Sequence, residues 1–403
     1  MTTTSTRTGR RGRIRARGLA AAVAAAASAA ALAACGSASS AAQPAAPSAA
    51  ASGPAASLAT SLSTAKDSWA IVPVSSNPAF WEVLVRPAPS ATWRLVTPPG
   101  VADNGGLVAA ADAGSGLTVA VRPSQDLHFT PVASTADAGA SWSTDGPLSQ
   151  GVASSPGALA VSGRALVALL GNGTIEASSD AGATWRTLAK PGMIAASSAG
   201  QKCGTVGVSA VSFGPIPTDV LAAGRCGATG SADLFSYAAD HGWQRLSLPV
   251  SGQLVRLGAG SALVRAKAGL TELWLGGWYA YAPLSPSSTS PFAADWMKSA
   301  PLPVTNAVIA SGGLAGATAT STDGTWVLLP GGQAATIGGP GQQWLLLPPT
   351  PAHTTVLASG PGTSLDALAV SGVKVTVWQL DRGSTLWAKV QTISVPVQPG
   401  SSS

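Results

Sequence analysis

The sequence predicts an all-β protein, and three observations lead to this fold class. Apolar runs are short, rich in β-branched residues and separated by Gly, Pro, Asn or Ser, as in segments 117–121 and 373–378. The body of the chain lacks the three-to-four-residue apolar spacing of amphipathic helices. Tryptophans recur along it at regular intervals. An all-β body of this length requires a repeated architecture or several sandwiches.

The first 34 residues have the three parts of a signal peptide. Six arginines and no acid occupy the start, a mostly alanine run covers 19–34, and small residues precede Cys35. Beyond residue 35, basic and acidic residues are equal at 17 each. The net charge of +6 therefore belongs to the leader, and it does not indicate binding to nucleic acid.

The end of this leader, Leu32-Ala33-Ala34-Cys35, resembles the signal of bacterial lipoproteins. The resemblance implies that Cys35 is lipidated, with palmitate among its acyl chains, and becomes the new N-terminus. We therefore expect export and a lipid anchor on the outer face of the bacterial cell membrane. A plain signal peptide is the alternative, and a transmembrane helix is disfavoured because the apolar run has about 16 residues against the ~20 required. The export route, general secretory or twin-arginine, stays open.

The mature chain divides by composition into three parts. Residues 35–66 hold the lipidated cysteine and a flexible Ala/Ser/Pro linker, 67–397 form the folded body, and 398–403 are a disordered tail. In an oxidising compartment, Cys203 and Cys226 are expected to form a disulfide. Two cysteines and scattered histidines do not make a metal site, so no metal and no cofactor is predicted.

Two nearly identical octets occur 43 residues apart, Thr-Ala-Asp-Ala-Gly-Ala-Ser-Trp at 135–142 and Ser-Ser-Asp-Ala-Gly-Ala-Thr-Trp at 178–185. In such a turn the Asp accepts bonds from amides, the Gly adopts a restricted backbone angle and the Trp packs between sheets. Both octets resemble the Asp-box of BNR-repeat β-propellers, a group that includes bacterial sialidases and propellers that assemble photosystems. The resemblance implies a structural, non-catalytic role for Asp137, Gly139, Trp142, Asp180, Gly182 and Trp185.

The tryptophan ladder extends this repeat over the whole body, with spacings between 43 and 58 residues. Seven repeats predict a seven-bladed β-propeller of four-stranded blades. In the fifth repeat Trp278 competes with Trp296. The first repeat is one strand short, and segment 392–397 is predicted to supply that strand and close the ring. The ladder consists of Trp93, Trp142, Trp185, Trp243, Trp296, Trp344 and Trp387.

A glycoside hydrolase of the sialidase-like type is one functional hypothesis. Sialidases use an arginine cluster, a Tyr nucleophile paired with a Glu, and an Asp as acid or base. The chain has three Tyr and three Glu, and none can be matched to the family's catalytic positions. Another glycosidase would need two facing carboxylates. No catalytic residue is assigned, and the enzyme remains the alternative.

The preferred hypothesis is a non-catalytic binding or scaffold protein for an envelope protein or glycan, held to the membrane by its lipid. Trp278, Tyr279 and Tyr281 are candidates for stacking on a sugar, although aromatics of a Gly-Gly hairpin more often fill a blade interface. A purely structural envelope spacer is a third class that the sequence leaves open. Nucleic acid is not an expected partner.

Overall fold

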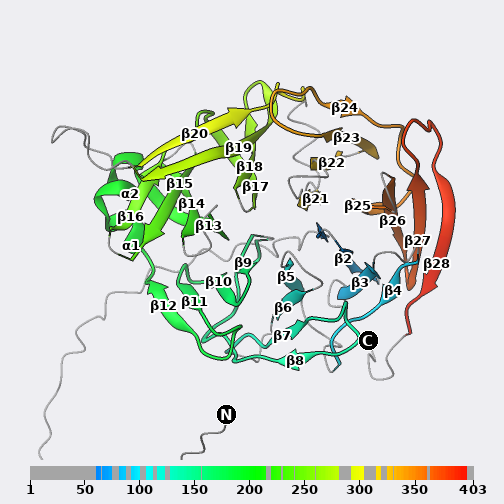
Figure 1. Ribbon diagram of the computed structural model, residues 1–403, viewed down its shortest axis with the longest axis horizontal. Helices are drawn as coiled ribbons and strands as arrows, with labels where there is room; N and C mark the ends of the chain where they lie inside the picture. The colour runs from blue at the N-terminus through cyan, green and yellow to red at the C-terminus, as the bar shows by residue number, and fades with distance from the viewer. Residues whose placement is uncertain are drawn as a thin grey trace, which may run out of the picture. The chain divides into compact units, whose positions relative to one another are not determined.

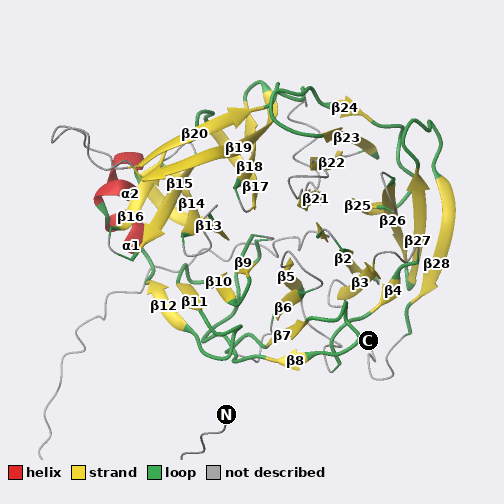
Figure 2. Cartoon of the chain, viewed as in Figure 1, coloured by secondary structure: helices red, strands yellow, loops and turns green. Residues whose placement is uncertain are grey.

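The computed structural model of the protein describes residues 60–64, 66–74, 81–87, 92–99, 106–111, 116–122, 128–155, 157–214, 219–227, 230–239, 241–258, 260–280, 292–303, 315–318, 325–329, 331–360 and 364–396. Seven four-stranded blades form a ring in this part of the chain (Figure 1; Figure 2). The first strand of each blade lies near the centre and the fourth lies at the rim. The predicted all-β, seven-bladed propeller is therefore confirmed.

The strands follow the chain blade by blade, and each is paired with its neighbour in antiparallel fashion. Blade 1 consists of β1 (Thr60–Ser63), β2 (Asp67–Pro73), β3 (Trp81–Pro87) and β4 (Arg94–Leu95). Blade 2 consists of β5 (Leu107–Ala111), β6 (Leu117–Val121), β7 (Val132–Thr135) and β8 (Ser143–Thr144). Blade 3 consists of β9 (Leu159–Ser162), β10 (Ala165–Leu169), β11 (Ile175–Ser178) and β12 (Arg186–Ala189).

Blade 4 consists of β13 (Thr205–Phe213), β14 (Val220–Cys226), β15 (Ser231–Ala238) and β16 (Gly242–Leu246). Blade 5 consists of β17 (Gly252–Gly258), β18 (Ser261–Ala266), β19 (Gly269–Ala280) and β20 (Phe292–Lys298). Blade 6 consists of β21 (Ala315–Thr318), β22 (Thr325–Leu329), β23 (Gln333–Ile337) and β24 (Leu345–Leu346). Blade 7 consists of β25 (Thr354–Ser359), β26 (Leu365–Ser371), β27 (Lys374–Leu380) and β28 (Ala388–Ser394).

The second strand of a blade is well buried, and the rim strand is more exposed. All five residues of β6 are buried, as are six of the seven residues of β2. Both residues of β8 and both residues of β24 are exposed. A blade is buried on both faces because it lies between two neighbours, which explains why its inner strands are continuous apolar runs instead of alternating ones.

The tryptophan ladder marks the outermost strand of every blade. Trp243 and Trp296 lie within β16 and β20, and each of the other five ladder tryptophans directly precedes the fourth strand of its blade. Trp278 lies on β19, the third strand, so Trp296 is the ladder position of blade 5. The period read from the sequence therefore corresponds to one blade.

Several ladder tryptophans also tie one blade to the preceding one through the indole N–H. The Nε1 of Trp142 donates to the carbonyl of Val96 at 2.9 Å, and that of Trp185 donates to Gly146 at 2.7 Å. The Nε1 of Trp387 donates to Pro348 at 3.3 Å. In each case the acceptor lies just after the outer strand of the previous blade. The ladder thus fixes the angle between adjacent blades as well as filling their interface.

The predicted closure of the ring by segment 392–397 is wrong. Residues up to Ser394 belong to β28, which pairs with β27 and is the fourth strand of blade 7. The missing strand of blade 1 is β1, which lies within the segment predicted to be linker. Thr60, Ser61 and Ser63 are buried there. The low-complexity composition concealed this strand, because small hydroxyl residues suit both a flexible tether and the crowded centre of a propeller.

The inner strands of blades 6, 7 and 1 meet at the centre. β1 pairs in parallel with β21, with Ser61 opposite Ala317, so blades 6 and 1 share one eight-stranded sheet. The hydroxyl of Ser61 also donates to the carbonyl of Leu357 on β25 at 2.5 Å. The N-terminal strand is therefore held by two blades besides its own.

Two short helices, α1 (Met193–Ala196) and α2 (Ser198–Cys203), connect blades 3 and 4. Throughout the described part of the chain, no helix has the length and apolar character needed to cross a bilayer. The predicted signal peptide, the lipidation site Cys35 and the tail 398–403 lie outside the described residues.

Candidate functional site

The two octets form the same hydrogen-bonded turn, located between the third and fourth strands of blades 2 and 3. In the second octet, Oδ1 of Asp180 accepts from the backbone N–H of Thr184 at 3.0 Å, and Oδ2 accepts from its hydroxyl at 2.6 Å. Ser178 donates to the same carboxylate and accepts from the N–H of Gly182 at 2.9 Å. Gly182 has a φ of 85°, a value that glycine adopts without strain.

The first octet repeats this geometry with Asp137, whose carboxylate accepts from the N–H and hydroxyl of Ser141 at 2.9 and 2.6 Å. Hydrogen bonds from Ser141 and Thr184 lower the pKa of Asp137 and of Asp180, respectively, to about 2. Both carboxylates are therefore occupied by their own turns. Neither is available as a general acid or base at neutral pH.

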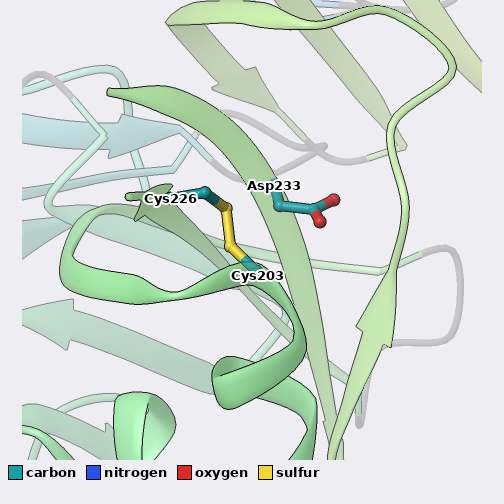
Figure 3. A group of neighbouring side chains, drawn as sticks. All are labelled: Cys203, Cys226 and Asp233. Carbon is teal, nitrogen blue, oxygen red and sulfur yellow. A yellow bond between two sulfur atoms is a disulfide. The ribbon is translucent and has the colours of Figure 1, made fainter. Parts of the chain in front are cut away.

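Cys203 and Cys226 form the predicted disulfide, which joins the end of α2 to the end of β14 with a Cα–Cα distance of 5.2 Å (Figure 3). Asp233 of β15 lies beside the two sulfurs, and the three potential ligand atoms are within 4.8 Å of one another. Its carboxylate, however, pairs with Arg245 and accepts from the N–H of Leu248 at 3.1 Å. The sulfurs are bonded to each other, so this group is a structural cluster.

Three carboxylates, Glu272 fully buried and the other two half-buried, lie in three different blades, each with a partner of its own. Burial raises the pKa of each carboxyl, and the hydrogen bond or charge of its partner lowers it in part. Each of these carboxylates is held by a partner within its own blade, whereas glycoside hydrolysis requires two carboxylates that face one another. The pairs are Glu82 with Thr97 in blade 1, Asp145 with Ser134 in blade 2, and Glu272 with Arg256 in blade 5.

Two further carboxylates flank one arginine where blade 7 meets blade 1. Nε of Arg86 lies 3.3 Å from Oδ2 of Asp366, and the charge of Asp67 also acts on this guanidinium. Burial raises the pKa of Asp366 to about 6, although Trp93 and Arg86 oppose the rise. Asp67, Arg86 and Asp366 are 4%, 6% and 2% exposed. This cluster is sealed inside the seam between the blades, so a substrate has no access to it.

A cleft of about 740 Å³ lies between blades 6 and 7. The buried apolar residues between these blades include Trp326, Leu357 and Ala367, and partly buried residues such as Trp378 and Trp387 pack against them. The cleft lies beside this cluster. A partly apolar cleft of this size is typical of a ligand site.

The walls of the cleft come from the outer part of blade 6 and from the turn that follows β27. Leu345, Leu346 and Leu347 line one side, and Leu365 and Leu380 line the other. A segment of polar residues, 381–385, forms the rim of blade 7. Blades 6 and 7 lie side by side in Figure 1, where β24 and β28 mark their rims.

The candidate residues from the sequence do not meet at this cleft. Trp278 and Tyr279 belong to β19 of blade 5, but their side chains, like the whole of Tyr281, lie outside the described residues. The cleft itself was missed. Its signal was the run Leu345-Leu346-Leu347, since three consecutive leucines cannot all face the core from a short rim strand.

Comparison with known proteins finds no matching family model and no match among curated proteins. Among solved structures, a xyloglucanase from Xanthomonas campestris is 14% identical with a TM-score of 0.46, and the match covers 78% of this chain. This chain spans half the length of that enzyme. YCF48 from Cyanidioschyzon merolae is 14% identical with a TM-score of 0.38, over 80% of this chain and 92% of that one.

A fucose-specific lectin from Aleuria aurantia is 13% identical with a TM-score of 0.41, over 85% of this chain and 96% of that one. Propellers similar to this chain thus include an enzyme and a lectin. These likenesses show the propeller fold alone.

Proposed function

We propose that this protein is a membrane-anchored, extracytoplasmic propeller that acts as a non-catalytic binding or scaffold protein for an envelope protein or glycan. The observation that supports the proposal is the contrast between the cleft and the carboxylates. The cleft between blades 6 and 7 has leucine walls and a polar rim. The carboxylates described above are each engaged inside a turn, a blade or the closing seam. The cleft supports a binding role, and the arrangement of these particular carboxylates gives no comparable support to acid–base catalysis.

The proposal places the chain with Asp-box propellers of the BNR type. Its support is the pair of turns at 135–142 and 178–185, where an Asp, a hydroxyl residue and a Gly make the same hydrogen bonds in two successive blades. A turn that holds the rim of a blade positions loops without reacting with a ligand. This role is compatible with a scaffold as well as with an enzyme.

The membrane anchor rests on Leu32-Ala33-Ala34-Cys35 and on the arginine-rich, alanine-rich leader before it. Diacylglycerol on the thiol and a further acyl chain on the new amino group would hold the protein stably, because two chains suffice where one does not. Cys35→Ser is expected to move the protein from the membrane fraction to the soluble fraction. A variant that stays in the membrane fraction would contradict lipid anchoring.

The binding role is tested by presenting the full chain to a glycan array and a panel of chromogenic glycosides, with membrane crosslinking in parallel. We expect saturable binding to a glycan or a specific crosslinked protein, and no turnover. Hydrolysis of any glycoside that is lost on mutation of a carboxylate would favour the alternative, a sialidase-like glycoside hydrolase. Absence of both binding and crosslinking would contradict the proposal.

A further inference from the structure

The cleft between blades 6 and 7 is bordered by an unusual concentration of exposed aliphatic side chains. Leu345 and Leu346 on β24, which line the cleft, are 63% and 55% exposed, and Leu386, one position beyond the last lining residue, is 78% exposed. These are three of the four most exposed large hydrophobic residues that the structure describes; Val206 of blade 4 is the fourth. Apolar side chains gathered beside a cleft mark an interaction site, because covering them removes apolar surface from water.

The walls of the cleft suit an aliphatic ligand better than a sugar. Trp326 is the aromatic residue of the lining, but it is only 3% exposed, and its indole N–H donates to the carbonyl of Leu357 at 3.0 Å. It therefore offers neither a ring face nor a donor to a ligand. The accessible walls are the leucine side chains, which contact aliphatic groups.

A string of polar groups runs along the same cleft. The amide of Gln379 donates to the hydroxyl of Ser364 at 3.0 Å and to Oδ1 of Asp381 at 3.1 Å. Ser359 and Thr385 add hydroxyls to the lining. A bare acyl chain would cover these groups without hydrogen bonds, at a cost for each group. An extended peptide presents N–H and C=O groups at regular intervals and side chains to alternate sides, so it satisfies both kinds of lining.

The charged residue at the rim of the cleft, Arg382, favours a ligand that carries a negative charge. Arg382 lines the cleft and forms no ion pair with any described carboxylate, while its neighbour Asp381 is engaged with Gln379. A carboxylate on the ligand would find an available guanidinium at one end of the aliphatic cleft.

We propose that this cleft binds an extended segment of a partner protein, with aliphatic side chains at alternate positions and an acidic residue that pairs with Arg382. The inference rests on the proposed binding function and specifies its ligand as a peptide. The leucines supply most of the contact area, and Arg382 sets the charge preference and the direction of the segment.

The test selects random nonapeptides, displayed on phage, against the immobilised full chain. We expect the selected sequences to carry Leu, Ile or Val at alternate positions together with Asp or Glu. The best peptide, synthesised with a fluorescent label, should bind Leu346→Glu at least tenfold more weakly than the unchanged protein. Val206→Glu is the matched control, an equally exposed aliphatic residue on another blade, and should bind within twofold. Selection against Arg382→Glu should yield basic instead of acidic peptides.

The other possible results would contradict the inference, and they distinguish failure of the peptide site from failure of the proposed function. Selected peptides without this pattern, an empty selection, or equal affinity for Leu346→Glu and Val206→Glu would overturn the peptide site. Saturable binding on a glycan array that is lost in Leu346→Glu would overturn the ligand class but leave the binding function intact. Turnover of a glycoside would overturn the proposed function as well. Circular dichroism and the melting temperature show whether each variant is folded.

Discussion

The indole N–H of Trp93 donates a 2.8 Å hydrogen bond to Oδ2 of Asp366, across 273 positions of sequence. In blades 2, 3 and 7 the equivalent tryptophan donates to a backbone carbonyl of the previous blade. At the seam where the ring closes, a buried carboxylate replaces that carbonyl, and Arg86 pairs with it. Because no strand is shared between blades 7 and 1, this charged cluster takes part in closing the ring.

The seam predicts a pH dependence of stability. The pKa of Asp366 is raised from 3.8 to about 6, so the folded protein holds this proton more tightly than the unfolded chain does. The resulting stabilisation is fully present below about pH 4 and is lost as the pH rises through about 6. It amounts to about 3 kcal/mol. Urea unfolding between about pH 4 and pH 7 should show this decline in the wild type.

The matched variant for this prediction is Asp366→Asn, which keeps the shape of the side chain but cannot titrate. The difference in free energy of unfolding between the two proteins should change by about 3 kcal/mol over the same pH range. Parallel pH profiles for the two proteins would contradict the assignment, because other buried acids such as Glu82 contribute equally to both.

Replacement of Trp93 by Phe should destabilise the ring more than the same change at Trp142. Trp93→Phe removes the hydrogen bond to the buried carboxylate of Asp366 and leaves only its ion pair with Arg86, which costs about 2–3 kcal/mol beyond the packing loss. Trp142→Phe removes a neutral bond to the carbonyl of Val96, worth about 1 kcal/mol. Equilibrium unfolding measures both changes. Equal losses in the free energy of unfolding would show that the hydrogen bond to the charged Asp366 contributes no more than the neutral one to Val96.

Gly139 should tolerate a side chain less well than Gly163, although both have a positive φ. An added Cβ at Gly139 would lie 2.6 Å from Cβ of Val96, whereas at Gly163 no atom lies within 4 Å. Gly163→Ala is expected to cost about 1–2 kcal/mol from backbone strain alone. Gly139→Ala should cost a further 1–3 kcal/mol, roughly, from the clash. Thermal unfolding of the two variants separates these contributions, and similar losses would argue against the packing of the turn on Val96.

Removal of the disulfide should weaken the part of the ring formed by α2 and β14. Cys203 and Cys226 close a loop with a sequence separation of 23. The double variant Cys203→Ala, Cys226→Ala is expected to lose about 3 kcal/mol in free energy of unfolding. The wild type treated with a reductant should lose a similar amount, while the variant should not respond. An unchanged midpoint in both cases would contradict a stabilising role.

Local sequence patterns predicted most of the fold. The octets at 135–142 and 178–185 contain every residue of their turns, and the tryptophans mark the rim of each blade, so both were recognisable. β1 was not, because its Thr and Ser residues continue the composition of the linker before it. Its pairing with β2 and β21 depends on the ring being closed.

The cleft and the seam could not be predicted for a different reason. The cleft is lined by residues of both blade 6 and blade 7, so it is a property of two sheets together and of neither segment alone. The seam joins Trp93 and Arg86 to Asp366 over more than two hundred residues. Sequence spacing carries no information about contacts of that range.

The binding role is tested most directly by photo-crosslinking in the native membrane. A photoreactive amino acid is introduced at position 346, in the cleft, or at position 206, on blade 4, of the full chain. We predict a discrete crosslinked protein partner from position 346 that is absent from position 206 and is lost in Arg382→Glu. The same products from both positions, or no product from position 346, would contradict a binding site between blades 6 and 7.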